Sequence, residues 1–226
     1  MNIYGDGGNV LALTKRLEWR GIEYNLVRVG VGDTFDFASA DLIFGGGGQD
    51  KGQLAVAEDL ASKADSLREA ASSGVVMLMV CGMYQLFGHG FQPTEGDYIP
   101  GIGVFDAETR GGERRMIGNV VVDSAWGQLV GFENHSGVTT LGVNQPSLGR
   151  VHMGYGNDGT SGEEGAITQN VYGTYLHGSL LPKNPEFADH LLVLAAQRRL
   201  GNDYKLSKLD DQLERLAHDS ATKLVQ

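Results

Sequence analysis

The single cysteine of the chain, Cys81, stands where an apolar run meets a turn. The six residues before it, 75–80, are all apolar and predict a buried strand, and Gly82 permits a sharp turn into a helix. A residue on such a junction projects from the carboxyl edge of a sheet. There, backbone N–H groups and the helix dipole stabilise a thiolate and an oxyanion. The position favours a nucleophile, although a lone cysteine is more often an inert core residue.

Two other segments also end predicted strands in glycine-containing turns. Residues 41–44 run into four consecutive glycines at 45–48, and residues 170–176 end at His177 and Gly178. In a parallel sheet these ends meet at one edge, so Cys81 and His177 would form a minimal nucleophile–base pair. Glycine N–H groups could approach a carbonyl oxygen closely, whereas a phosphate loop would end in Lys-Ser or Lys-Thr, which is absent after residue 48.

The order of predicted elements indicates an α/β fold. Helices at 9–20 and 53–73 alternate with strands at 22–30, 41–44 and 75–80, which predicts a doubly wound, mostly parallel sheet flanked by helices. Short strands at 101–105, 117–122, 129–132 and 150–152 predict an antiparallel extension, and the polar segment 157–164 is expected to be a mobile loop. A helix is predicted at 185–200. We expect one domain over 1–206, with 207–226 as an amphipathic helix of that domain or a partner-binding one.

Composition excludes several classes of function. The formal net charge of −10 and the absence of basic runs argue against binding nucleic-acid phosphates. There is no signal-peptide pattern and no apolar run long enough to cross a membrane, so we expect a cytoplasmic protein without membrane insertion. One cysteine cannot form an internal disulfide, and no histidine–carboxylate spacing suggests a metal site.

Several motifs resemble one family. Residues 80–88 (VCGMYQLFG) look like the nucleophile turn of class I (triad-type) glutamine amidotransferases, whose fold is flavodoxin-like. Residues 46–50, 131–137 and 173–178 are similar to the cobyric-acid-synthase-like (CobB/CobQ) branch. Within that branch, residues 2–9 and 115–119 resemble the glutaminase subunits of lipid II isoglutaminyl synthase. Relatives usually have a strand before residue 2, which leaves one sheet edge unaccounted for.

The resemblance implies catalytic roles. Cys81 would attack the side-chain amide of L-glutamine and release ammonia, leaving a glutamyl thioester. His177 would activate Cys81, protonate the ammonia and then activate water. The N–H groups of Gly47 and Gly82 would form the oxyanion hole, where losing one donor typically costs about 3–4 kcal/mol of barrier.

The resemblance also implies residues that bind glutamine. Gln85 and Gly46 would contact it, and Arg115 would pair with its α-carboxylate, a role that suits a bidentate guanidinium. Asn134 and His135 would line the pocket, with a hydrogen-bonded turn as an equal alternative.

One position departs from the family pattern. Most class I amidotransferases carry a glutamate two residues after the catalytic histidine, where this chain has Ser179. A Cys–His dyad without an orienting acid should be a poor catalyst, because the correct imidazole tautomer is not enforced. The resemblance implies that a Mur-ligase-like partner (MurT) supplies an aspartate in a heterodimer, so we expect low glutaminase activity from the isolated chain.

The resemblance further implies that the chain holds no cofactor and that ATP and Mg²⁺ bind to the ligase partner. That partner would amidate the D-glutamate α-carboxylate of the lipid II stem peptide during peptidoglycan synthesis. Three alternatives stay open: a cobyric acid synthase-type amidotransferase in cobalamin biosynthesis, a stand-alone cysteine hydrolase of the same fold (a γ-glutamyl hydrolase or peptidase), and a non-catalytic regulatory domain.

Overall fold

Three parallel strands form the centre of the fold in a computed structural model that describes residues 6–47 and 50–223. The first sheet has the order β1-β2-β10-β9. Its parallel strands are β1 (Leu42–Gly45), β2 (Val76–Val80) and β10 (Val171–Thr174), and β9 (Ala166–Thr168) runs antiparallel to β10. Every residue of β2 is buried, because a central parallel strand is covered on both faces.

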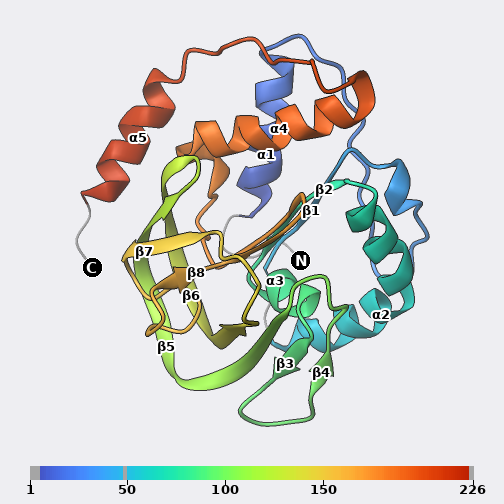
Figure 1. Ribbon diagram of the computed structural model, residues 1–226, viewed down its shortest axis with the longest axis vertical. Helices are drawn as coiled ribbons and strands as arrows, with labels where there is room; N and C mark the ends of the chain where they lie inside the picture. The colour runs from blue at the N-terminus through green and yellow to red at the C-terminus, as the bar shows by residue number, and fades with distance from the viewer. Residues whose placement is uncertain (1–5, 48–49, 224–226) are drawn as a thin grey trace.

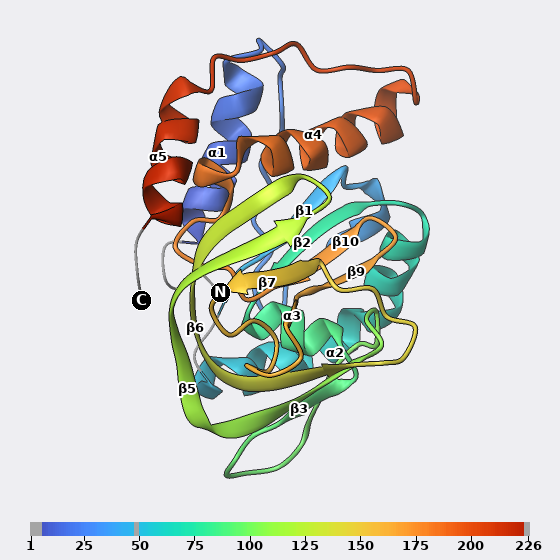
Figure 2. The same ribbon diagram turned by 60° about the vertical axis from the view of Figure 1, so that its left-hand side comes forward.

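Helices cover both faces of this sheet. Figures 1 and 2 show α1 and α4 on one side and α2 and α3 on the other. The helical segments are α1 (Gly7–Glu18), η1 (Phe37–Ser39), α2 (Asp50–Ser72), α3 (Gly82–Phe87), η2 (Leu181–Lys183), α4 (Pro185–Leu200) and α5 (Gln212–Thr222). The predicted doubly wound core is therefore confirmed.

The antiparallel strands form a second sheet and do not simply extend the first. A long hairpin of β5 (Ala107–Ser124) and β6 (Gly127–Leu141) dominates it and curves around the parallel core in Figure 2. The sheet is completed by β3 (Gly90–Gln92), β4 (Ile99–Pro100), β7 (Gly149–Met153) and β8 (Glu163–Glu164). An antiparallel bridge between Phe132 and His177 joins this hairpin to the end of β10.

Two predicted strands are wrong. Residues 22–30 are mostly exposed and form no strand, because they pair with no other strand in the part of the chain that the structure describes. Residues 101–105 instead bond back to the end of α3: Gly101 N–H donates to the His89 carbonyl and Ile102 N–H to the Leu86 carbonyl, both at 2.8 Å. Hydrogen bonds of a local turn replace the strand pairing that was predicted for these residues.

The segment 157–164 is also not the loose loop that its composition predicts. Asn157 is 1% exposed and Glu164 is fully buried. The tip of the segment folds around Asp158, whose side chain accepts hydrogen bonds from the N–H groups of Thr160 and Ser161. Polar residues that satisfy one another inside the fold cannot be told from solvated ones by composition.

The terminal helix α5 packs on η2 and β6. His218 Nδ1 lies 2.9 Å from the Lys183 carbonyl, and Arg16 of α1 forms an ion pair with Asp211 at 2.7 Å. The division at residue 206 stays a prediction. No helix in the described part of the chain is long and apolar enough to span a membrane.

Candidate active site

Cys81 occupies a strained turn between β2 and α3. It caps α3 with φ 52° and ψ −110°, a conformation that non-glycine residues rarely adopt. Its N–H donates to the Thr174 carbonyl at 2.8 Å, so the turn is fastened to the neighbouring strand β10. A strained residue held in this way is typical of a nucleophile turn.

His177 follows β10 and is fully buried. The bridge to Phe132 holds its backbone, with N···O distances of 2.8 and 3.2 Å. Burial lowers the pKa of the imidazole. Hydrogen bonds with Asp6 and with the Cys81 thiol outweigh that effect and raise the pKa to about 9. Cys81 and His177 are therefore brought together, as the sequence predicts.

The structure places a carboxylate of this chain beside His177, although the position two residues after the histidine holds Ser179. Oδ1 of Asp6 lies 3.5 Å from Nδ1 of His177, and both side chains are fully buried. The acid comes from the loop before α1 and not from the position two residues after the histidine. Asp6 is part of the opening motif 2–9, but sequence reasoning missed it. Nothing in the local sequence shows that the loop before α1 meets the residues that follow β10.

Gly47 lies against the reacting pair. A Cβ added to it would be 2.9 Å from Cε1 of His177 and 3.4 Å from Cβ of Cys81. Its N–H donates to Oδ2 of Asp6 at 2.5 Å, so in this structure the predicted oxyanion donor already has an acceptor.

The other glycines of the predicted site are placed by the same two turns. Gly46 is buried beside Gly47, while residues 48 and 49 lie outside the described residues. Gly82 is the first residue of α3, where N–H groups have no acceptor within the helix. Its predicted role in the oxyanion hole fits this position and stays a prediction.

Gln85 and His135 belong to a buried cluster around Tyr175. Nε2 of Gln85 donates to the Tyr175 hydroxyl at 3.1 Å. The His135 ring stacks on that of Tyr175 with centroids 3.6 Å apart, and its Nδ1 lies 2.8 Å from the Gly137 carbonyl. His135 lies within strand β6 and pairs with Met116, so the predicted turn is not present there, and its predicted place in the glutamine pocket stays a prediction.

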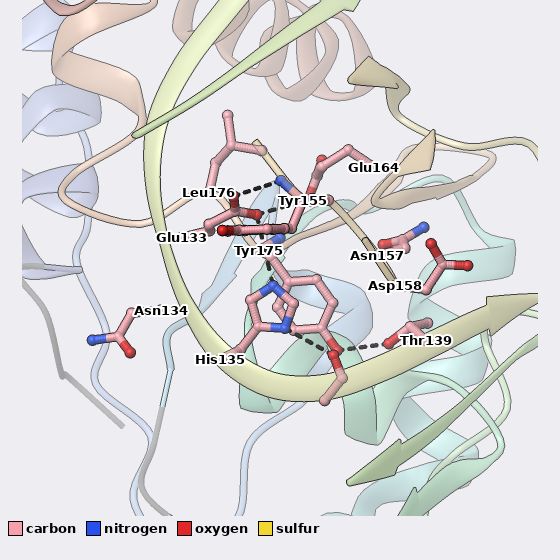
Figure 3. Close-up of polar contacts among 12 residues, drawn as sticks. Glu133, Asn134, His135, Thr139, Tyr155, Asn157, Asp158, Glu164, Tyr175 and Leu176 are labelled. Carbon is pink, nitrogen blue, oxygen red and sulfur yellow. Dashed lines mark hydrogen bonds and ion pairs between the residues drawn. The ribbon is translucent and has the colours of Figure 1, made fainter. Parts of the chain in front are cut away.

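Arg115 and Asn134 pair across β5 and β6. Nε of Arg115 donates to Oδ1 of Asn134 at 2.6 Å on the outer part of the hairpin. Figure 3 shows the Asn134 side chain pointing away from the cluster that contains His135 and Tyr175. Their predicted contact with a substrate stays a prediction.

The arrangement suits nucleophilic acyl transfer. In such a reaction Cys81 would supply the nucleophile, His177 the base and Asp6 the group that orients the imidazole, as in other nucleophile–base–acid sets. Within residues 6–47 and 50–223 no group of three or more histidine, cysteine, aspartate or glutamate side chains could hold a metal ion.

Comparison with known proteins places these residues in a family context. Residues 1–185 match the model of the CobB/CobQ-like glutamine amidotransferase domain. The chain is 36% identical to the GatD subunit of a glutamine-hydrolysing lipid II isoglutaminyl synthase from Staphylococcus aureus, over 95% of this chain and 87% of that protein. It is also 36% identical to the GatD subunit from Streptococcus pneumoniae, over 94% and 83%.

More distant matches show the same fold or a shared part. A probable cobyric acid synthase from Methanothermobacter thermautotrophicus is 34% identical over 51% of this chain but only 25% of its own length. A crystal structure of a glutamine amidotransferase aligns with a TM-score of 0.58 at 16% identity, over 82% of this chain and 93% of that one. At this identity the structural match concerns the fold alone.

Proposed function

The chain belongs to the CobB/CobQ-like glutamine amidotransferase family, and on that premise we propose that it is the glutamine-hydrolysing subunit of a lipid II isoglutaminyl synthase. The observation that carries the proposal is the convergence of Cys81, His177 and Asp6 at one sheet edge, against Gly47. The similarity to two GatD subunits along most of their length supports the choice of reaction.

In the proposed mechanism Cys81 attacks the side-chain amide carbon of glutamine as a thiolate. The N–H of Gly82 and of Gly47 stabilise the oxyanion, which requires Gly47 to exchange its bond to Asp6 for one to the substrate. The tetrahedral intermediate breaks its C–N bond, and protonated His177 donates a proton to the departing ammonia. His177 then takes a proton from water, which hydrolyses the thioester to glutamate and frees the thiol.

Ammonia would be consumed by a separate ATP-dependent subunit of the Mur-ligase type, which would bind ATP and Mg²⁺ and amidate the D-glutamate α-carboxylate of lipid II. We propose that Arg115 binds the α-carboxylate of glutamine, with Asn134 fixing the guanidinium. The cobyric acid synthase alternative is less favoured, because the chain matches only about a quarter of the length of such a relative.

The test is ammonia release from glutamine by the chain alone and with the ligase subunit. Activity should be low alone, because the Gly47 N–H is held by Asp6, and should rise with the partner. Cys81→Ser should abolish it in both states. Hydrolysis of γ-glutamyl peptides at a rate equal to that of glutamine, without dependence on the partner, would instead indicate a stand-alone hydrolase.

A further inference from the structure

A buried carboxylate that the proposed mechanism does not use lies behind the active site. Glu164 of β8 is fully buried. Its Oε1 accepts a hydrogen bond from the Tyr175 N–H at 2.6 Å, and the Thr174 hydroxyl lies 3.1 and 3.2 Å from its two oxygens. Figure 3 shows Glu164 together with Glu133 and Tyr175. A buried carboxyl group without partners would be costly, so its contacts need an explanation.

The backbone segment that Glu164 contacts is hydrogen-bonded to Cys81 and leads into His177. The Thr174 carbonyl accepts the N–H of Cys81 at 2.8 Å, and its hydroxyl accepts the N–H of Leu176 at 3.0 Å. The next residue is His177. One carboxylate thus fastens the short segment 174–176, which anchors the nucleophile on one side and leads into the base on the other.

The backbone next to Glu164 is held in place by Asn157. Oδ1 of Asn157 accepts the N–H of Gly165 at 2.9 Å, and its Nδ2 donates to the Gly165 carbonyl at 3.0 Å. Gly165 has φ +65°, and a Cβ there would be 2.3 Å from the Gly173 carbonyl. Only glycine allows this close approach, which brings the carboxylate of Glu164 onto β10.

A second buried carboxylate lies close by. Glu133 accepts the N–H groups of Tyr155 and Gly156 at 2.7 and 2.9 Å, and it follows Phe132, the bridge partner of His177. Burial raises the pKa of Glu164. The pKa is lowered by hydrogen bonds from the Tyr175 N–H and the Thr174 hydroxyl and by the charge of His177, and it is raised by the charge of Glu133. The resulting pKa of Glu164 is about 8. The titratable groups around the two carboxylates are Tyr84 of α3, Glu133 and His135 of β6, Glu163 of β8, and Tyr175 and His177 after β10.

We propose that Glu164 is a positioning residue for Cys81 and His177. Its bonds to the Tyr175 N–H and the Thr174 hydroxyl hold segment 174–176 in place, and that segment is bonded to Cys81 and leads into His177. Glu164 touches neither the thiol nor the predicted substrate in the contacts described above. The inference rests on the proposed function only in taking Cys81 and His177 as the reacting pair.

The test uses the reactivity of the single cysteine and not glutamine turnover. The rate of alkylation of the full-length chain by iodoacetamide is measured for the wild type, Glu164→Gln, Glu164→Leu and Glu163→Gln. Glutamine keeps an acceptor for the Tyr175 N–H and leucine does not, and Glu163 is the neighbour on the same strand. Glu164→Leu should react about tenfold more slowly than the wild type, because segment 174–176 is no longer held beside the turn at Cys81, whereas Glu164→Gln should stay within about twofold.

Glu163→Gln should follow the wild type. Equal rates for Glu164→Leu and the wild type would overturn the proposal. So would an equal loss of rate in Glu164→Leu and Glu164→Gln, because an acceptor at this position would then not be what holds the segment.

A second pair of variants applies if Glu164→Leu does not fold. Thr174→Val removes the hydroxyl that contacts Glu164, while Thr174→Ser keeps it. We expect the loss of alkylation rate in the valine variant alone, and equal rates for the two variants would overturn the proposal. Ammonia release is measured separately. Its absence from the complex together with slow alkylation of Glu164→Leu would count against the proposed function and for the role of Glu164.

Discussion

Oδ1 of Asp6 lies 3.5 Å from Nδ1 of His177, although the two residues are 171 positions apart in the sequence. Its other oxygen accepts the N–H of Gly47 at 2.5 Å. One buried carboxylate thus contacts both the His177 imidazole and the glycine turn that faces it. The loop before α1 is therefore part of the candidate site.

Replacement of Asp6 by asparagine should lower kcat for glutamine hydrolysis by about 100-fold or more, with a smaller change in KM. The amide keeps an acceptor for Gly47, but it cannot stabilise the imidazolium or enforce the tautomer. Steady-state kinetics of the complex measure this. Asp33→Asn, at an exposed turn, is the control and should leave kcat unchanged. An undiminished kcat in Asp6→Asn would mean that another acid, such as one from the partner, orients His177.

Alanine at Gly47 should reduce activity strongly. The added methyl group would meet Cε1 of His177 at 2.9 Å and Oδ2 of Asp6 at 3.2 Å, so the imidazole must move from its position beside the thiol. Misplacement by about an ångström can cost about 100-fold in rate. Gly30→Ala is the matched control, because its nearest neighbour is the flexible end of Asp33 at 3.2 Å. Equal activity of the two variants would contradict the placement of Gly47.

The elements around the nucleophile could be predicted from the sequence because their signals are local. The apolar run 75–80, the glycine at 82 and the helix-forming residues 83–87 are sufficient to identify β2, the turn at Cys81 and α3. The ends of the predicted strands 41–44 and 170–176 indicated the glycine turn and His177 in the same way, and the family motifs added their roles. The helix at 185–200 was also correct, since a proline at its start and a glycine after its end mark both limits.

Long-range pairing explains what the sequence did not reveal. Asp6 reaches His177 only because α1 lies beside η2, after the strand that carries the histidine. Glu164 and Asn157 sit in a polar, glycine-rich stretch whose composition is that of an exposed loop, yet both are buried by mutual hydrogen bonds. The run 22–30 has the composition of a strand but no hydrogen-bonded strand beside it in the described chain. The local sequence shows the secondary-structure propensity of a segment, but it does not show which distant segment will pair with it.

Stability should fall as the pH rises from neutral to alkaline. The folded-state pKa of His177 is raised to about 9, above its ordinary value of 6.5, so its stabilising contribution is complete below pH 6.5 and is lost as the pH rises through 9. Glu164, with a pKa raised to about 8 from 4.5, acts in the same direction between those two values. Melting temperatures at a series of pH values measure the slope.

The variant His177→Asn separates the two contributions to this slope. Its melting temperature should fall less than that of the wild type between about pH 6.5 and 9, because only the Glu164 contribution is left. Parallel curves for the two proteins would show that His177 does not hold its proton more tightly in the folded state.

The strain at Cys81 predicts an inverted order of stability for two inactive variants. Cys81→Gly should be more stable than Cys81→Ala by about 1 kcal/mol, because glycine adopts φ 52° and ψ −110° without the penalty that a Cβ incurs. At an ordinary position the order is the reverse, as Ala61→Gly on the exposed side of α2 should show by losing about 1 kcal/mol. Urea unfolding of the three variants and the wild type measures the differences. If glycine destabilised position 81 as it does position 61, the turn would carry no strain, and the geometry that presents the thiol would have to arise from packing alone.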